Sequence, residues 1–108
     1  MREPTYFLLL ALAEGPAHGY AIAKRAEELS GGAVRLTAGT LYGALDRLVD
    51  AGTIMVEGET VVSGRRRRTY RITDGGRLEL AAEVERLKSA AAAAAHLDLP
   101  LVAETGRS

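Results

Sequence analysis

The chain has 108 residues, 47% of them hydrophobic and 26% charged, and its 14 basic side chains balance its 14 acidic ones. This size fits one folded domain with a modest core, for which association with a second copy would add stability. The absence of cysteine excludes disulfides and thiolate metal sites, and the apolar run of residues 6–13 is too short to cross a bilayer and lacks a cleavable signal pattern. We therefore expect a cytoplasmic, single-domain, dimeric protein without a membrane segment.

Two short helices are predicted before residue 30. The first covers residues 6–13, with Thr5 as its N-cap, and it ends before Pro16 because proline disfavours helical geometry in the residue ahead of it. The second begins after His18 and Gly19 and ends at residues 30–32, which include two glycines suited to the end of a helix. Helical spacing predicts that its buried face consists of Tyr20, Ile22, Ala23, Ala26 and Leu29.

A third helix is predicted from Thr37, a natural N-cap, to about Ala51, where Gly52 ends it. Its apolar face has the spacing i, i+3, i+4, i+7 and comprises Leu41, Ala44, Leu45 and Leu48. The pattern then changes to the alternation of strands. Residues 53–57 and 60–62 are expected to form one strand with a bulge at Gly58, and residues 69–72 the antiparallel return after a turn at residues 63–64.

A final helix is predicted over residues 74–97, capped by Thr73 and Asp74. Its heptad-like seam consists of Leu80, Val84, Leu87, Ala91 and Ala94. The fold class is therefore mainly α with a small β-hairpin. We expect a winged helix-turn-helix in residues 1–73, one long C-terminal dimerisation helix in residues 74–97 and a flexible tail in residues 98–108.

Positive charge is concentrated at the tip of the hairpin. Residues 1–64 carry 5 basic and 8 acidic side chains, residues 65–77 carry 6 and 1, and residues 78–108 carry 3 and 5. The four consecutive arginines Arg65, Arg66, Arg67 and Arg68 lie at and just beyond the turn. Such a cluster repels itself unless it faces solvent or a polyanion. Because strand side chains alternate, Arg66 and Arg68 are expected on one side and Arg65 and Arg67 on the other.

The third helix of a winged helix-turn-helix enters the major groove of double-stranded DNA. The residues that its apolar face leaves outside suit this use, since small glycines let the backbone approach DNA and hydroxyls at a helix N-terminus favour phosphate. The predicted DNA-binding residues are Thr37, Gly39, Thr40, Tyr42, Gly43 and Arg47, with Arg65–Arg68 of the wing at the flanking backbone or the minor groove. The alternative is that the glycines are merely weak helix formers, that Tyr42 packs on the second helix and that the arginines form a solvated loop.

Other chemistry finds little support in the sequence. The only two histidines, His18 and His96, lie on different predicted helices, and no cysteine is present. No grouping of serine, histidine and aspartate has a recognisable spacing, and no phosphate-binding loop surrounds Gly31 and Gly32. We therefore expect no catalytic residues, no metal site, no cofactor and no enzymatic activity.

Together the motifs resemble the PadR family, the transcriptional regulators named after the phenolic acid decarboxylase repressor. The resemblance extends from about residue 6 to residue 87 and is carried by HGYAI from His18, GTLYGALDRL from Gly39, GTI from Gly52, RRRTYRIT from Arg66, and Gly76. It implies a winged-helix DNA-binding domain, a homodimer formed through the C-terminal helix, and repression relieved by a small molecule. Two departures are Gly43, where many relatives carry proline or a larger residue, and the lack of tryptophan in the final helix.

The leading hypothesis is a ligand-responsive homodimeric repressor that binds a palindromic operator. The residues expected at the dimer interface, or lining a central cleft for an apolar effector, are Tyr6, Leu10, Leu80, Val84, Leu87 and Ala91. Two alternatives stay open. One is a dimer whose main role is to bind a small molecule, and the other is a winged helix used for protein–protein contact.

Overall fold

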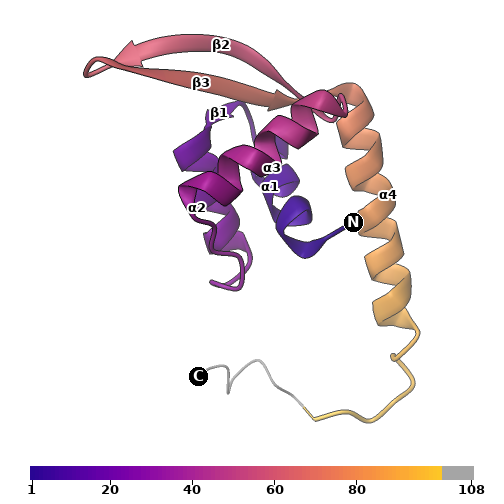
Figure 1. Ribbon diagram of the computed structural model, residues 1–108. Coiled ribbons are helices and arrows are strands. Elements are labelled where there is room, and N and C mark those ends of the chain that lie inside the picture. The colour runs from indigo at the N-terminus through magenta and orange to yellow at the C-terminus, as the bar shows by residue number, and fades with distance from the viewer. Residues whose placement is uncertain (101–108) are drawn as a thin grey trace.

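The computed structural model describes residues 1–100, and within them it contains four helices and three strands (Figure 1). In chain order these are α1 (Glu3–Ala13), β1 (Ala17–His18), α2 (Gly19–Leu29), α3 (Ala38–Asp50), β2 (Ile54–Val62), β3 (Arg65–Ile72) and α4 (Asp74–Ala92). The prediction of a mainly α winged helix-turn-helix with a long last helix is confirmed. No helix among the described residues has the length and apolarity needed to cross a membrane.

The core lies where α1, α2 and α3 meet the base of the hairpin. Its fully buried larger side chains are Leu8, Leu9, Leu12, Ile22, Leu45, Ile54 and Tyr70. Each buried aliphatic side chain of this kind contributes about 1.5–3 kcal/mol relative to exposure. Because α3 and the hairpin both contribute to this core, their positions relative to each other are fixed by it.

The predicted face of α3 is confirmed. Leu41 and Leu45 are buried, and Ala44 and Leu48 are half-buried against the same core. Thr37 is the N-cap, as predicted, and its hydroxyl oxygen accepts a hydrogen bond from the N–H of Thr40 (3.3 Å).

The first helix begins earlier than predicted. It starts at Glu3 with Arg2, not Thr5, as the N-cap, and it includes Pro4 in its first turn. Proline is tolerated there because the first N–H groups of a helix have no partner inside the helix. The prediction of Thr5 as the cap was therefore wrong.

The sheet has a third strand that the sequence did not reveal. β1 pairs with β3, so that Ala17 lies opposite Tyr70 and His18 opposite Thr69, and the strand order is β1-β3-β2. Two residues are too few to show strand alternation. The bulge predicted at Gly58 is confirmed by a shift of the β2–β3 register at this point.

The arginine run lies inside β3, and the return strand is four residues longer than predicted. Arg65–Arg68 pair in register with residues 62 to 59 of β2. The turn at Ser63 and Gly64 has φ values of 52° and 78°, a left-handed conformation that glycine adopts readily. As a result the hairpin of β2 and β3, which forms the wing, is a long ribbon with the arginines along one strand (Figure 1).

The last helix is anchored to the end of β3 and packs beside α1. The Thr73 hydroxyl accepts from the N–H of Gly76 (3.0 Å), confirming the predicted cap, and it is also within hydrogen-bond distance of the carbonyl oxygen of Gly52 (2.7 Å). α4 ends at Ala92 instead of the predicted Leu97, and turns follow it. Of the tail predicted to be flexible, residues 101–108 lie outside the described residues.

Candidate nucleic-acid interface

The predicted recognition residues of α3 lie on its solvent side. Thr37, Gly39, Thr40, Tyr42 and Arg47 are exposed, and only Gly43 is half-buried. Since Leu41 and Leu45 point into the core, the rest of the first two turns is left free for a partner. The structure therefore brings the predicted residues of this helix together on one face.

The two glycines of α3 are not required by packing within the chain. A β-carbon added at Gly39 would meet no heavy atom within 4 Å, and one added at Gly43 would lie 3.5 Å from Nη1 of Arg47. A methyl group would therefore fit at both positions. The described contacts within the chain do not require glycine at either one.

Tyr42 joins α3 to the start of α2. Its side chain is 44% exposed, yet a β-carbon added at Gly19 would lie 2.7 Å from its hydroxyl oxygen. The expectation that Tyr42 is on the outside and the alternative that it packs on the second helix both describe part of its surroundings. Its ring packs on α2 at Gly19, while almost half of the side chain stays exposed.

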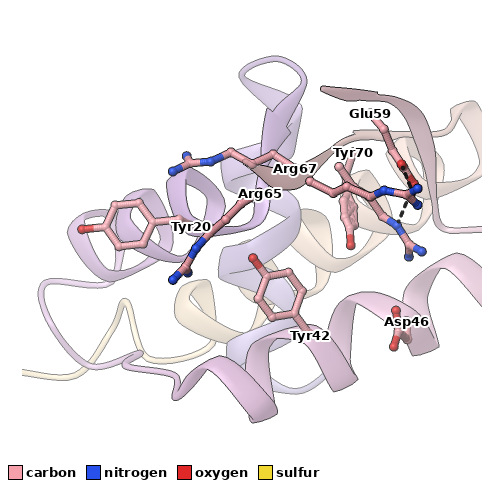
Figure 2. Close-up of a pocket in the computed structure, with 9 residues that line it drawn as sticks. Tyr20, Tyr42, Asp46, Glu59, Arg65, Arg67 and Tyr70 are labelled. Carbon is pink, nitrogen blue, oxygen red and sulfur yellow. Dashed lines mark hydrogen bonds and ion pairs between the residues drawn. The ribbon is translucent and has the colours of Figure 1, made fainter. Parts of the chain in front are cut away.

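Tyr20 was wrongly assigned to the buried face of the second helix. Its side chain is 69% exposed, whereas Ile22 and Ala26 are buried. At about 100° per residue, a position two residues before Ile22 lies on the opposite side of the helix. Tyr20 therefore stands beside Tyr42 on the solvent side (Figure 2).

A groove of about 570 Å³ separates the wing from α3 (Figure 2). It is lined by aromatic and charged side chains: Tyr20, Tyr42, Asp46, Glu59, Arg65, Arg66, Arg67, Arg68 and Tyr70. All four arginines of the wing thus line the same groove as Tyr42 and Asp46 of the third helix. A concave basic surface with aromatic rings fits a polyanion such as a nucleic acid backbone.

The four arginines differ in their partners. Arg66 and Arg68 both form ion pairs with Glu59, at 3.8 and 3.4 Å, which agrees with the predicted sharing of one side of the strand. Hydrogen bonding to Tyr70 and Glu59 raises the pKa of Arg68. Nη1 of Arg67 instead lies 3.5 Å from Nε2 of His18, at the start of α2.

His18 is a further member of this surface. It is the N-cap of α2, where its Nδ1 accepts a hydrogen bond from the N–H of Ala21 (3.4 Å). A neutral imidazole has only one acceptor nitrogen, so the ring can accept from Ala21 at Nδ1 or from Arg67 at Nε2, but not from both at once. The HGY motif drew attention to His18 in the sequence, although no role at the site was assigned to it.

Like His18, four residues that line the groove were not predicted as site residues: Tyr20, Asp46, Glu59 and Tyr70. Glu59 joins the site because β2 places it opposite Arg68, and this register depends on the bulge at Gly58. Tyr70 is buried, and burial raises its pKa. No group of three or more potential metal ligands occurs in residues 1–100.

The residues predicted for a dimer interface or effector cleft have mixed surroundings. Leu80 is only 7% exposed and belongs to the chain's own core, while Tyr6, Leu10 and Val84 are half-buried. Leu87 and Ala91 are exposed further along α4. A shallow groove of about 280 Å³ is lined by Arg77, Leu80, Ala81, Val84 and Glu85. The free part of the predicted seam therefore begins after Leu80.

Comparison with known proteins supports the same reading of the fold. A transcriptional regulator of Mycobacterium tuberculosis, Rv3488, is 43% identical over 68 residues, which are 63% of this chain and 60% of that protein. A 37.1 kDa protein of transposon TN4556 from Streptomyces fradiae is 58% identical over 41 residues, 38% of this chain and 11% of the relative. The chain thus spans less than two thirds of these relatives.

Solved structures match over most of the chain. A transcriptional regulator from Clostridium thermocellum has a TM-score of 0.70 and 25% identity, covering 87% of this chain and 92% of that one. Bacillus subtilis PadR, solved in complex with operator DNA, has a TM-score of 0.69 and 25% identity, covering 94% of this chain and 52% of that one. The model of the transcriptional regulator PadR-like family matches residues 8–82, and the chain belongs to this family.

Proposed function

We propose that the chain is a homodimeric, sequence-specific DNA-binding repressor, and that its operator is a palindrome. The observation that carries this proposal is the shared groove of about 570 Å³, which Tyr42 and Asp46 of α3 line together with all four wing arginines. The B. subtilis PadR structure contains operator DNA and has the same fold, which supports DNA as the partner of this chain. A repressor of this kind would act in the cytoplasm.

The third helix would read the major groove through its first two turns. Gly39 and Gly43 let the backbone come close to the base edges, and Tyr42 presents its accessible face beside them. The Thr37 hydroxyl donates to the hydroxyl oxygen of Thr40 (3.0 Å), so the Thr40 hydroxyl keeps its own hydrogen for an outside acceptor such as a phosphate. Arg47, one turn further, would reach the flanking backbone.

Dimerisation would depend on residues 74–92, with residues 1–73 as the DNA-binding unit. Val84, Leu87 and Ala91 remain available on α4 for a second copy, with Tyr6 and Leu10 of α1 nearby in the proposed interface. The shallow groove beside Leu80 and Val84 is where an apolar effector would bind between subunits. Sedimentation equilibrium of wild type and Leu87→Glu tests this part, because a charge at the seam should shift a dimer to monomer.

Use of the wing for protein–protein contact is less well supported. The exposed start of α3 carries glycines and hydroxyl groups instead of the contiguous apolar patch that a protein interface core would need. A basic groove is also a better match to phosphates than to a flat apolar partner.

Selection of duplexes from a randomised pool tests sequence-specific binding and identifies the operator sequence in the same experiment. We expect enrichment of an inverted repeat whose half-sites are about one helical turn apart, roughly 10 base pairs. The variants Tyr42→Ala and Thr40→Ala should reduce the enrichment. A pool that stays random after repeated rounds with the wild type would contradict the proposal.

A further inference from the structure

The four wing arginines differ in their surroundings, because Glu59 forms ion pairs with two of them. We propose that Glu59 acts as an internal counter-ion that neutralises Arg66 and Arg68, so that Arg65 and Arg67 make the main phosphate contacts of the wing. Glu59 thereby limits the affinity for DNA of any sequence. This inference rests on the proposed DNA-binding function and assigns separate roles within the same site.

The cross-strand register brings Glu59 to this place. It lies opposite Arg68 in the β2–β3 pair, and its carboxylate reaches Nε of Arg68 at 3.4 Å and Nη1 of Arg66 at 3.8 Å. One carboxylate thus serves two guanidinium groups on the same side of the ribbon. Figure 2 shows Glu59 joined to both by dashed lines, on the side of the groove away from Tyr20.

Arg65 and Arg67 have different surroundings. Within residues 1–100 neither forms an ion pair with a carboxylate, and the polar neighbour of Arg67 is the ring nitrogen of His18. Both side chains extend toward Tyr20 and the start of α2 (Figure 2). Their charge is therefore not compensated locally, and the N-terminal end of α2 adds a positive dipole on the same side.

Ion pairs as exposed as these are weak in water, since the Arg66, Arg68 and Glu59 side chains are 82%, 54% and 41% exposed. Their strength alone would not keep an arginine from a phosphate. The larger effect appears when DNA approaches, because the carboxylate stays close to the phosphates that its two arginines would contact. Like charges repel there, and each arginine would have to exchange one anion for another, which reduces the net gain.

Glu57 provides a matched control on the same strand. Its carboxylate pairs with Nε of Arg71 at 3.5 Å, and it is exposed to a similar degree as Glu59. Neither Glu57 nor Arg71 lines the groove. Glu57→Gln therefore removes the same charge from the wing without releasing Arg66 or Arg68.

The test is a double-mutant cycle read by fluorescence anisotropy on a selected duplex and on a random one, over a series of salt concentrations. The variants are Arg65→Gln/Arg67→Gln and Arg66→Gln/Arg68→Gln, each made with Glu59 intact and with Glu59→Gln. With Glu59 intact, we expect Arg65→Gln/Arg67→Gln to lower affinity about tenfold and Arg66→Gln/Arg68→Gln to lower it less than about threefold.

Removing the carboxylate should change this ranking. Glu59→Gln alone should tighten binding to both duplexes by about fivefold and steepen the salt dependence, by up to about 3.6 in log–log slope if a dimer gains four phosphate contacts. In this background Arg66→Gln/Arg68→Gln should now cost about tenfold. Glu57→Gln should have a clearly smaller effect than Glu59→Gln.

Two results would overturn the inference while leaving the proposed function intact. In one, the wild type binds DNA, but the Arg65→Gln/Arg67→Gln and Arg66→Gln/Arg68→Gln variants lose equal affinity, both with Glu59 and with Glu59→Gln. The other is an identical gain from Glu59→Gln and Glu57→Gln, which would mean that only total charge matters. Wild-type protein that binds neither duplex would instead refute the proposed function itself.

Discussion

The ring of Tyr42 lies against Gly19 so closely that a β-carbon at Gly19 would sit 2.7 Å from its hydroxyl oxygen and from its Cε1. Real β-carbons do not approach other atoms so closely, so the ring of Tyr42 packs on the start of α2 in the space that glycine leaves open. The contact holds the tyrosine ring against α2 while 44% of the side chain remains exposed.

Gly19→Ala should therefore displace Tyr42 without altering any other predicted DNA contact. We expect a loss of up to about 1–3 kcal/mol in the free energy of unfolding, because the ring must give way to the added methyl group. With the ring displaced, affinity for a selected operator should fall more than affinity for random DNA. Urea unfolding and anisotropy measure the two effects. Unchanged selectivity in a folded variant would mean that the position of Tyr42 is not used for recognition.

Gly43→Ala separates a role in helix stability from a role in DNA approach. The added methyl group has room, so alanine should stabilise α3 by about 0.5–1 kcal/mol. If the backbone lies close to DNA at this turn, the same methyl group should weaken operator binding. Gly39→Ala should act in the same direction. A variant that is more stable and binds as tightly as wild type would indicate that these glycines are only weak helix formers.

Gly76→Ala should disturb the junction between the wing and α4. A β-carbon there would collide with the backbone carbonyl oxygen of Thr53 and crowd Ile72. Since a backbone atom cannot rotate away, we expect a loss of about 2 kcal/mol or more in the free energy of unfolding. Gly75→Ala is the matched control, because its β-carbon would meet only Oγ1 of Thr73 at an ordinary 3.8 Å. Equal stability of the two variants would contradict the close packing described for Gly76.

The stability of the protein should depend on Glu83 at mildly acidic pH. A hydrogen bond from Arg86 holds the pKa of the buried Glu83 carboxyl below its ordinary value of 4.5. A carboxyl whose pKa is lowered by folding contributes its full stabilisation at pH values above its pKa in the unfolded protein. This contribution is lost as the pH falls through its pKa in the folded protein. The Tm difference between wild type and Glu83→Gln should therefore be larger at about pH 6 than at about pH 3.

Glu85→Gln is the control for this pH series, since it removes an exposed carboxylate that pairs with Lys88 on the same helix. A Tm difference between wild type and Glu83→Gln that stays constant across the series would show that the Arg86 contact does not perturb Glu83.

The parts of the fold that were predictable from sequence depend on local chemistry. Thr37 and Thr73 act as caps because their hydroxyls reach an N–H three residues later, whatever surrounds them. The Leu41 and Leu45 face follows from helix periodicity, and the bulge at Gly58 from a glycine within a strand. Each of these features is determined within a few residues of the chain.

The parts that were missed depend on contacts between distant segments. Leu80 fits a heptad seam, yet it is buried in the chain's own core because α4 packs beside α1. β1 exists only because Ala17 and His18 meet the edge of β3. Glu59 joins the arginines through the register of two strands, and such a register is set by the whole sheet. Short-range patterns carry no information on these pairings.

Binding to DNA is tested most directly by fluorescence anisotropy with wild-type protein. The two duplexes are the DNA upstream of its own gene and a random sequence of equal length, each titrated at low and moderate salt. The contacts of α3 with base edges predict tighter binding to the upstream DNA. Four wing phosphate contacts per dimer, two from each Arg65 and Arg67 pair, predict a log–log salt slope of at least roughly 3 to 4 in magnitude. Equal, weak binding to both duplexes would contradict the account, because only an unspecific basic wing would remain.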